Sequence, residues 1–245
     1  MKSIWQGEIL NMRILKLLIH RFGKWYIKKI CKSEYELQKP NEINERIVEY
    51  SFVFRSLLRV TANTVLDIGT GVSSLPYLLK YCGFMVTAID NIHDYWTRGM
   101  FNRHFYVIDD DITNTHITKK FDFITCISVL EHIQNHETAV RSMFTLLNPG
   151  GCMVLTFPYN ENKYIENVYK LPEAGYGQDA PYICQVYSRN ELDKWLKMNN
   201  GKIIDQEYWK VFTGDFWTFG EQLHPPRQVD NHQEHHLTCI LIKKV

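Results

Sequence analysis

A glycine-rich turn beside a carboxylate is the strongest chemical signal in this sequence. An apolar segment at 64–68 contains Asp67, and Gly69, Thr70 and Gly71 follow it before a helix-length segment begins. Glycine allows the backbone to approach a ligand closely, and the free N–H groups at the start of a helix face a polar or anionic group. A carboxylate two residues before the first glycine can bind a cationic group. The turn therefore predicts a site for a polar small molecule.

Two further carboxylates follow the next two apolar runs. Asp90 ends its run 23 residues after Asp67, and a carboxylate at that point can accept hydrogen bonds from both hydroxyls of a ribose. Asp111 comes after the following run and precedes Ile112, a pair that could bond an adenine amine and cover the ring. Three carboxylates at successive strand ends favour a common binding site over three unrelated solvated residues.

Alternating strand-length and helix-length segments must bring these carboxylates together. Short apolar runs lie at 64–68, 84–89, 104–108, 121–127 and 152–157, with helix-length segments at 73–82 and 135–147. Such alternation predicts a parallel sheet of right-handed crossover units, with ligands at the carboxyl ends of the strands. Ser188 and Glu191 form a capping box for a later helix, and runs at 203–212 and 237–242 predict two more strands.

The N-terminal arm differs in charge from the rest of the chain. Residues 1–32 carry a net charge of +7, whereas the remainder carries −6. Segment 9–30 reads as an amphipathic helix with a basic stripe. It lacks the small-residue cleavage site of a signal peptide. Two interpretations stay open: a helix on an anionic membrane surface, or a helix that caps the core with its basic residues solvated.

The sequence resembles the class I S-adenosylmethionine-dependent methyltransferases over about residues 60–160. The resemblance rests on five segments in order and spacing: VLDIGTG, VTAID, DDDI, FDFITCISVLEHI and LNPGGCMVLTF. It implies a Rossmann-like, doubly wound α/β fold, with a mostly parallel sheet of seven strands whose last strand is antiparallel. It also implies S-adenosylmethionine as the cofactor.

We expect two parts in the chain. Residues 1–60 would hold the basic amphipathic helix and a cap helix. Residues 61–245 would form the S-adenosylmethionine-binding catalytic domain, with a lid-like insertion at about 159–187 and a second insertion at about 213–236.

The same resemblance assigns cofactor-binding roles. The methionyl part would lie by Asp67 and the glycine loop, the ribose hydroxyls by Asp90, and the adenine by Asp111 and Ile112. The full expected set is Asp67, Gly69, Thr70, Gly71, Asp90, Asn91, Asp111, Ile112 and Ser128. The third loop glycine of the family is replaced by Ser73, which departs from the family pattern.

Methyl transfer from a sulfonium needs the acceptor in line with the C–S bond and, for an alcohol, a base that removes its proton. Candidate bases are His132, His136 and His224. His132 occupies the family's frequent Glu-His position, where the histidine is often structural or adjacent to the cofactor. His136 could instead be a solvated helix residue, and His224 part of a solvated His-rich loop.

A divalent metal is an alternative that the sequence does not favour. Some O-methyltransferases of ubiquinone synthesis and of small-RNA 3′-end methylation hold a metal with a Glu-x-x-Glu-His segment at this point. This chain has Ser128, Glu131 and His132 there, so one carboxylate is missing. The segment therefore offers a hard cation one ligand fewer and less negative charge. A metal held by Glu131, His132 and His136 is therefore possible, but we expect none.

These features predict a methyltransferase acting on a small-molecule or glycan acceptor, with a hydroxyl as the methylated group (O-methylation). The acceptor pocket would be built from the N-terminal helices, the tyrosine-rich segment 159–187 and the loop 213–236. Aromatic residues between 209 and 219 could line that pocket or fill the core. N-methylation of an amine or amino sugar is the main alternative.

Two alternatives belong to other classes. A dinucleotide-dependent oxidoreductase is disfavoured, because Ser74 stands where the GxGxxG pattern needs its third glycine. A non-catalytic binding module tethered to a membrane by the basic helix is the other.

Composition excludes several further classes of protein. The chain has 245 residues, of which 45% are hydrophobic and 22% charged, values that do not fit a disordered or collagen-like chain. The net negative charge beyond the arm argues against a nucleic-acid partner. No apolar run approaches the ~20 residues that span a bilayer. Six cysteines without a CxxC pair suit buried thiols in a cytoplasmic enzyme, which could still contact the inner face of the membrane.

Overall fold

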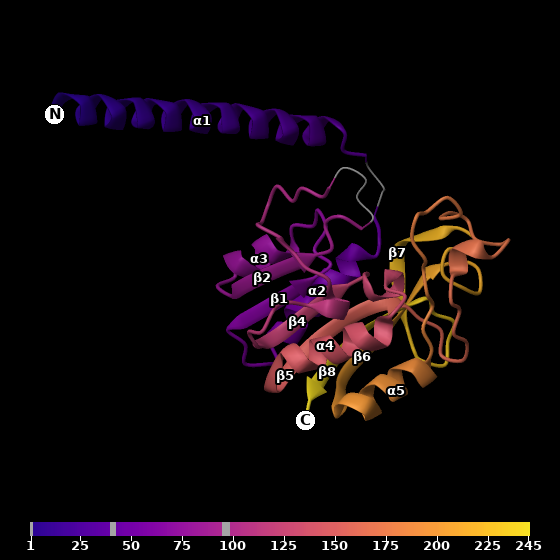
Figure 1. Ribbon diagram of the computed structural model, residues 1–245. Helices are drawn as coiled ribbons and strands as arrows, with labels where there is room; N and C mark the ends of the chain where they lie inside the picture. Colours follow the sequence, from indigo (N-terminus) through magenta and orange to yellow (C-terminus); the bar gives the residue numbers. More distant parts are fainter. Residues whose placement is uncertain (1, 40–42, 95–98) are drawn as a thin grey trace. The chain divides into compact units, whose positions relative to one another are not determined.

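The computed structural model describes residues 2–39, 43–94 and 99–245, with side chains described from Met12 onward (Figure 1). The chain divides into two units, 1–42 and 43–245, and each is described by itself. The first unit contains helix α1 (Lys2–Glu36), which is longer than the expected segment 9–30. Among the described residues, no helix is both long enough and apolar enough to cross a membrane.

One sheet organises the described part of the second unit, and its eight strands follow the order β3-β2-β1-β4-β5-β8-β6-β7 (Figure 1). The strands are β1 (Thr64–Ile68), β2 (Met85–Asp90), β3 (Ile108–Asp109), β4 (Phe121–Ile127), β5 (Leu147–Pro158), β6 (Gly201–Phe212), β7 (Gln222–Val229) and β8 (Leu237–Lys244). Strands β1 to β5 are parallel. Strand β8 is antiparallel to its neighbours β5 and β6. The Rossmann-like, mostly parallel α/β fold with an antiparallel last strand is confirmed.

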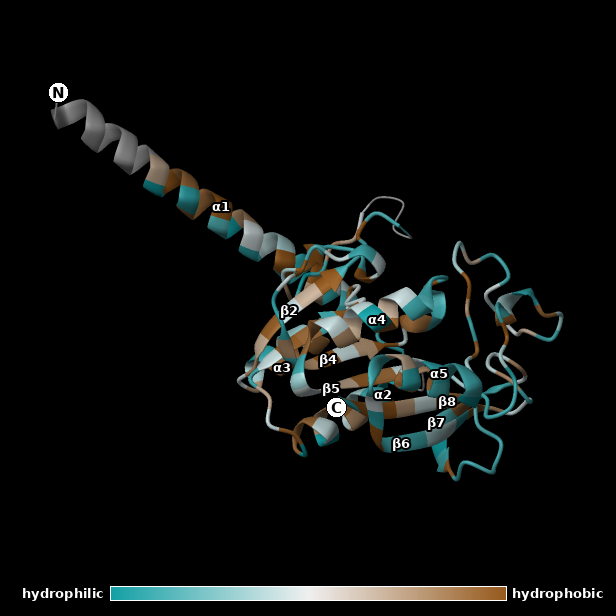
Figure 2. Cartoon of the chain, turned by 60° about the horizontal axis from the view of Figure 1, so that its bottom comes forward, coloured by the Kyte–Doolittle hydropathy of each residue, from teal (hydrophilic) through white to brown (hydrophobic). Residues whose placement is uncertain are grey.

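Helices cover both faces of this sheet. They are α2 (Arg46–Leu57), α3 (Leu75–Tyr81), α4 (His136–Leu146) and α5 (Arg189–Asn199). Successive strand residues point to opposite faces, so Val65 packs in the cluster with α2 and α3 while Leu66 packs in the cluster with α4 and α5. Hydrophobic residues accordingly concentrate in the central strands (Figure 2). The predicted capping box of Ser188 and Glu191 begins α5.

Strand β7 was not expected, because it lies within the segment 213–236 that reads as a loop. Among the described strands it pairs with β6 alone, at the edge of the sheet, and it contains Pro225 and Pro226. Proline cannot donate a hydrogen bond to a neighbouring strand and is tolerated mainly in edge strands. The described sheet therefore has eight strands where seven were expected.

The apolar run 104–108 also departs from expectation. Only Ile108 and Asp109 pair with β2. Phe105 and Val107 pack instead in a small separate cluster with Ala88. Much of this run therefore packs by its side chains against β2 and its surroundings, and only its end adds backbone pairing to the sheet.

The segment 159–187, which we call the excursion, is irregular apart from the short 3-10 helix Val168–Lys170. Its C-terminal end is tied to the segment after β4. The N–H of Gln185 donates to the carbonyl of Glu131, and the hydroxyl of Tyr187 donates to the carbonyl of Leu130. The excursion thus holds the chain around residues 130–133 in place.

Candidate functional site

A cavity of about 920 Å³ lies where β1, β2 and β4 end. All the residues expected to bind the cofactor line it, as does one of the three candidate bases. These residues are Asp67, Gly69, Thr70, Gly71, Asp90, Asn91, Asp111, Ile112, Ser128 and His132. The structure therefore brings together side chains that are up to 65 positions apart in the sequence.

Asp67 is a buried carboxylate held by two hydroxyl groups. Oδ1 accepts a hydrogen bond from Thr125 Oγ1 at 2.6 Å, and Oδ2 accepts one from Thr70 Oγ1 at 2.7 Å. Its side chain is almost completely buried. Burial raises the pKa of Asp67 to about 6, although both hydrogen bonds oppose this shift. A buried carboxylate of this kind gains from a positively charged neighbour in the cavity.

The glycine loop is shaped for close approach. Gly69 has φ of +68°, and a Cβ atom built there would lie 2.4 Å from both Cγ atoms of Val129. Gly71 also has positive φ, and its N–H donates to Asp90 Oδ2 at 2.6 Å. Burial raises the pKa of Asp90, and this hydrogen bond opposes the shift. Only glycine fits at position 69, so the loop can lie directly against the segment after β4.

Asn102 supports this loop and was missed by the sequence analysis. Its Nδ2 donates to the carbonyls of Gly71 and Ser73, both at 2.8 Å. Its Oδ1 accepts from the N–H groups of His104 and Phe105. No local pattern marks such a residue, because it acts across about 30 positions of sequence.

Asp111 and Ile112 lie together at the other end of the cavity. Asp111 is exposed, and its Oδ1 accepts from the N–H of Thr113 at 2.8 Å. Ile112 is buried against the cluster that contains α4. One polar and one apolar residue side by side suit a flat, partly polar ring.

His132 lines the cavity from the segment after β4. Its Nδ1 lies 2.7 Å from the carbonyl oxygen of Ile183 in the excursion. A carbonyl oxygen only accepts, so Nδ1 carries the hydrogen and Nε2 carries the lone pair. Burial lowers the pKa of His132, and the nearby Arg46 contributes to the lowering. The ring is therefore neutral at pH 7 and can accept a proton at Nε2.

A second polar group, centred on Glu49 of α2, borders the same segment. Glu49 is fully buried. Its Oε1 accepts from Ser128 Oγ at 2.5 Å and Thr156 Oγ1 at 2.6 Å, and its Oε2 accepts from Arg46 Nη1 at 2.8 Å. Arg46 Nη1 also donates to the carbonyl of Ile127 at 3.2 Å. These contacts fix one edge of a guanidinium group that lines the cavity.

The structure does not bring His136 or His224 to the cavity wall. His136 packs against the rings of Tyr187 and Trp195, and its buried Nδ1 has no hydrogen-bond partner among the described residues. His224 is exposed in β7, where its Nδ1 contacts the carbonyl of Ile43.

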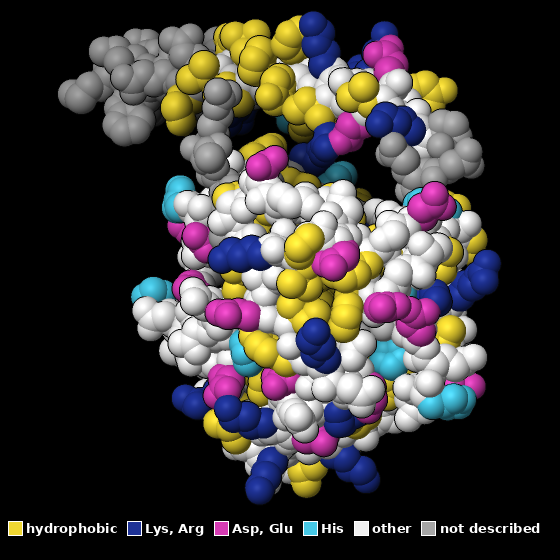
Figure 3. Space-filling model, turned by 90° about the vertical axis from the view of Figure 1, so that its right-hand side faces the viewer, with side chains coloured by type: hydrophobic (Ala, Val, Ile, Leu, Met, Phe, Trp, Pro, Cys, Tyr) yellow, Lys and Arg dark blue, Asp and Glu magenta, His cyan; other side chains and the backbone are white. Residues whose placement is uncertain are grey.

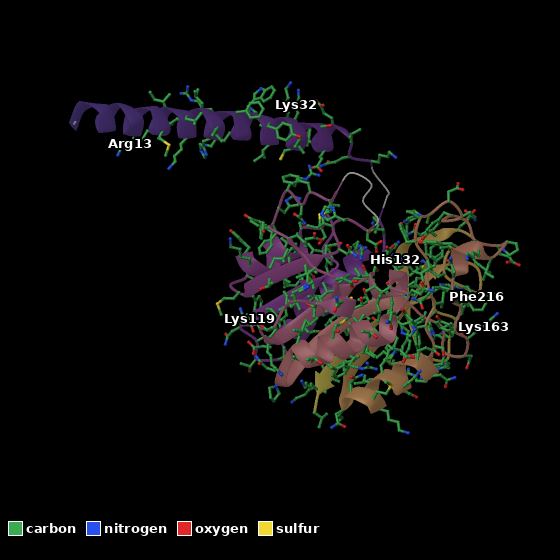
Figure 4. The ribbon with its side chains drawn as sticks, in the orientation of Figure 1. Arg13, Lys32, Lys119, His132, Lys163 and Phe216 are labelled. Atoms are coloured by element: carbon green, nitrogen blue, oxygen red, sulfur yellow. The ribbon has the colours of Figure 1, made fainter. Side chains whose placement is uncertain are left out.

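The region around 213–236 contributes no residue to the cavity wall. Phe212 and Trp217 are buried in the core, and Phe216, labelled beside Lys163 in Figure 4, lies apart from His132. The described residues contain no cluster of three or more His, Cys, Asp or Glu side chains arranged to hold a metal ion.

Arg46, Tyr50 and Tyr182 are polar or aromatic residues of the cavity wall that the sequence analysis did not single out. Arg46 and Tyr50 come from α2, and Tyr182 comes from the excursion. The ring of Tyr182 packs edge-on against His132, with 4.6 Å between the ring centres. These residues come from α2 and the excursion, two of the three regions expected to build an acceptor pocket, but no pattern singled out the individual positions.

Comparison with known proteins identifies the family. A family model described as a methyltransferase domain matches residues 35–206. The ubiquinone biosynthesis O-methyltransferase of Coxiella burnetii is 26% identical over 155 residues, which are 58% of this chain and 64% of that protein. The enzyme of the same name from Psychrobacter arcticus is 29% identical over 146 residues, 53% of this chain and 55% of its own length. The chain thus spans less than two thirds of these relatives.

Solved structures share the fold. The 1,6-didemethyltoxoflavin-N1-methyltransferase of Burkholderia thailandensis superposes with a TM-score of 0.55 at 14% identity, covering 92% of this chain and 90% of its own. A possible histamine N-methyltransferase of Thermotoga maritima gives 0.53 at 16% identity, with 90% and 100% covered. The family model covers well over half of the chain, and its description agrees with the cavity and the sheet. This protein therefore belongs to the methyltransferase domain family.

Proposed function

We propose that the cavity binds S-adenosylmethionine and that the enzyme methylates a hydroxyl oxygen of a small-molecule acceptor. The observation that carries this proposal is the joint placement of Asp67, Asp90 and a neutral His132 on the wall of one cavity. The carboxylates suit a cofactor with a sulfonium and a ribose. The histidine suits an acceptor that must lose a proton.

The residues present fit this cofactor. Asp90 would accept from the ribose hydroxyls, with Asn91 beside it, and Asp111 and Ile112 would bind the adenine. Asp67, the loop of Gly69, Thr70 and Gly71, and Ser128 would surround the methionyl part. The absence of a side chain at Gly69 lets the loop pack directly against Val129 at the cavity wall, and the buried Asp67 carboxylate would gain from a nearby positive charge.

His132 and Arg46 would act on the acceptor. When bound, S-adenosylmethionine supplies an activated methyl group with a neutral thioether as its leaving group. Nε2 of His132 takes the hydroxyl proton as the new C–O bond forms. Arg46, held by Glu49, would stabilise the negative charge that develops on the acceptor oxygen. Tyr182 packs against the histidine and restricts the position of its ring.

The acceptor is a small molecule or a glycan residue that offers a hydroxyl group. Relatives named ubiquinone biosynthesis O-methyltransferases support oxygen as the methylated atom. N-methylation is the second candidate, because Tyr50 and Tyr182 also line the cavity and their hydroxyls could orient an amine without a strong base.

A methyl-transfer assay with labelled S-adenosylmethionine tests the proposal. Matched acceptors, such as a catechol and the corresponding aromatic amine, distinguish oxygen from nitrogen when the products are analysed by mass spectrometry. We expect methylation of the catechol that declines at acid pH. Exclusive methylation of the amine would support the second candidate, and failure to bind the cofactor would refute both.

A further inference from the structure

Helix α1 carries an apolar face that no part of its own unit covers among the described side chains. Six large side chains recur at the spacing of one helix face: Leu15, Leu18, Ile19, Phe22, Trp25 and Tyr26. Each of them is between 51% and 65% exposed. Figure 2 shows the hydrophobic residues of the described part of α1 as a stripe along the helix. Exposed apolar stripes of this length mark interaction surfaces.

The opposite side of α1 is basic. Arg13, Lys16, His20, Lys24 and Lys28 follow one another at intervals of three or four residues. The sequence contains no Asp or Glu from residue 9 to residue 33. Figure 3 shows the hydrophobic and basic side chains of this helix together. The partner of α1 must therefore accept apolar side chains and offer negative charge.

An aromatic and basic border completes the pattern. Phe22 contacts both Trp25 and Tyr26, with ring centres 5.7 Å and 6.3 Å apart. The Nζ of Lys29 lies 4.6 Å from the ring centre of Trp25. Aromatic rings with a polar edge and lysines with a long apolar stem are favoured at the boundary between lipid tails and headgroups.

We propose that α1 lies on the surface of an anionic lipid bilayer, with its apolar face among the acyl chains and its basic face toward the phosphates. One apolar and one basic face along a helix fit binding in the plane of a membrane surface. Attraction of the basic residues adds to apolar burial and makes the binding depend on anionic lipid and on salt.

The charge pattern favours a bilayer over a second copy of the helix. Paired helices carry complementary acidic and basic residues beside their apolar seam. Two copies of α1 would instead bring basic residues together, since the acidic side chains of its described part lie at its C-terminal end, at Glu34 and Glu36. A membrane surface rich in phosphatidylglycerol offers the missing negative charge.

Co-sedimentation of the full chain with vesicles tests this proposal. We expect binding to phosphatidylcholine–phosphatidylglycerol vesicles, weak binding to pure phosphatidylcholine vesicles, and release by high salt. The variant Leu18→Asp with Phe22→Asp should lower the vesicle affinity by about tenfold or more, because it places charges in the apolar face.

A matched control separates insertion from charge. Leu17 and Ile27 are also exposed but lie among the basic residues on the other side of the helix. The variant Leu17→Asp with Ile27→Asp changes net charge and helix propensity comparably, so it should weaken binding less than the Leu18→Asp, Phe22→Asp variant and about as much as Lys16→Gln with Lys24→Gln, which also lowers the charge of the basic face by two units. Lys16→Gln with Lys24→Gln should weaken binding, whereas Lys119→Gln with Lys120→Gln, in the other unit, should not.

Three results would overturn the proposal. The first is that the full chain does not bind anionic vesicles, and the second is that the two aspartate variants lose vesicle affinity equally. The third is that light scattering shows a dimer that does not bind vesicles and that the Leu18→Asp, Phe22→Asp substitutions dissociate. The last result would assign the apolar face to a second copy of the chain.

Discussion

The Nδ1 atom of His132 lies 2.7 Å from the carbonyl oxygen of Ile183, so the excursion determines which nitrogen of the cavity histidine carries its hydrogen. Gln185 adds three bonds to the same segment: its backbone N–H donates to the carbonyl of Glu131, and its Nε2 donates to the carbonyls of Glu131 and Ile133. The excursion breaks the strand–helix alternation of the sequence. Through these bonds it orients the side chain of His132, which lies just after β4.

Replacement of His132 by alanine should reduce kcat by roughly 10² to 10⁴, the usual contribution of a general base. Binding of S-adenosylhomocysteine should change little, because the base acts on the acceptor. Single-turnover rates and calorimetry on the same preparation measure the two effects. Normal turnover with a saturating acceptor would remove His132 from this role.

The pH profile supplies an independent check on this residue. Burial holds the pKa of His132 below its ordinary value of 6.5, and only the neutral ring can take a proton. Activity should therefore persist below pH 6.5 and decline as the pH falls through the lowered pKa. An acid limb above pH 6.5 would contradict the assignment.

Asp67→Asn should stabilise the ligand-free protein while it weakens cofactor binding. A carboxyl whose folded pKa is raised from 3.8 to about 6 opposes folding increasingly as the pH rises above 3.8, and fully once the pH exceeds about 6. The shift corresponds to at most about 3 kcal/mol at neutral pH. The gain should appear in denaturant unfolding at pH 7 and vanish below the ordinary pKa.

Asp122 provides the opposite control for this stability effect. Hydrogen bonds, led by that from the N–H of Asn63, lower the pKa of Asp122 to about 2. This carboxylate stabilises the fold above its ordinary pKa, and that contribution is lost as the pH falls toward 2. Asp122→Asn should therefore destabilise the protein at pH 7. If the free energy of unfolding at pH 7 changed in the same direction in Asp67→Asn and Asp122→Asn, the electrostatic argument would be refuted.

Gly69→Ala should abolish measurable cofactor binding, because the new methyl group would lie 2.4 Å from Val129 and the backbone would keep its positive φ. The matched control is Gly83→Ala, which also has positive φ but has open space around it. That variant should lose about 1 kcal/mol of stability and still bind S-adenosylhomocysteine. Loss of binding in both variants would point to general misfolding.

Arg46→Gln should lower kcat/KM for the acceptor by roughly tenfold, the effect of losing one hydrogen bond to a charged oxygen. The dissociation constant of S-adenosylhomocysteine should stay the same. Arg55→Gln breaks a comparable ion pair with Glu207 that does not border the cavity, so it should leave kcat/KM intact. A change in cofactor binding with unchanged acceptor kinetics would reassign Arg46.

The sequence predicts the cofactor end of the cavity because that chemistry is local. Asp67 and Asp90 lie at the carboxyl ends of β1 and β2, Gly69 follows β1 directly, and parallel strands bring such positions to one edge. Arg46 and Asn102 could not be found in this way. The hydrogen-bond partners of Arg46 and Asn102 lie between 3 and 81 positions away in the sequence. These contacts depend on how α2 and the segment after β2 pack.

The three candidate histidines also show that sequence patterns alone do not reveal how side chains pack. His132, His136 and His224 are equivalent as residue types, and only packing distinguishes them: the first lines the cavity, the second lies against Trp195, and the third is in β7. Strand β7 itself escaped prediction because Pro225 and Pro226 are typical of loops, and an edge strand is the exception that tolerates them.

Calorimetric titration of the full chain with S-adenosylhomocysteine tests the central claim most directly. We predict one binding site per chain in the wild-type protein and a large loss of affinity in Asp90→Ala, whose carboxylate would hold the ribose. Asp94→Ala, which removes a neighbouring carboxylate at the cavity rim, is the control that should still bind. Wild-type protein that binds no S-adenosylhomocysteine, or Asp90→Ala protein that binds it normally, would contradict the account.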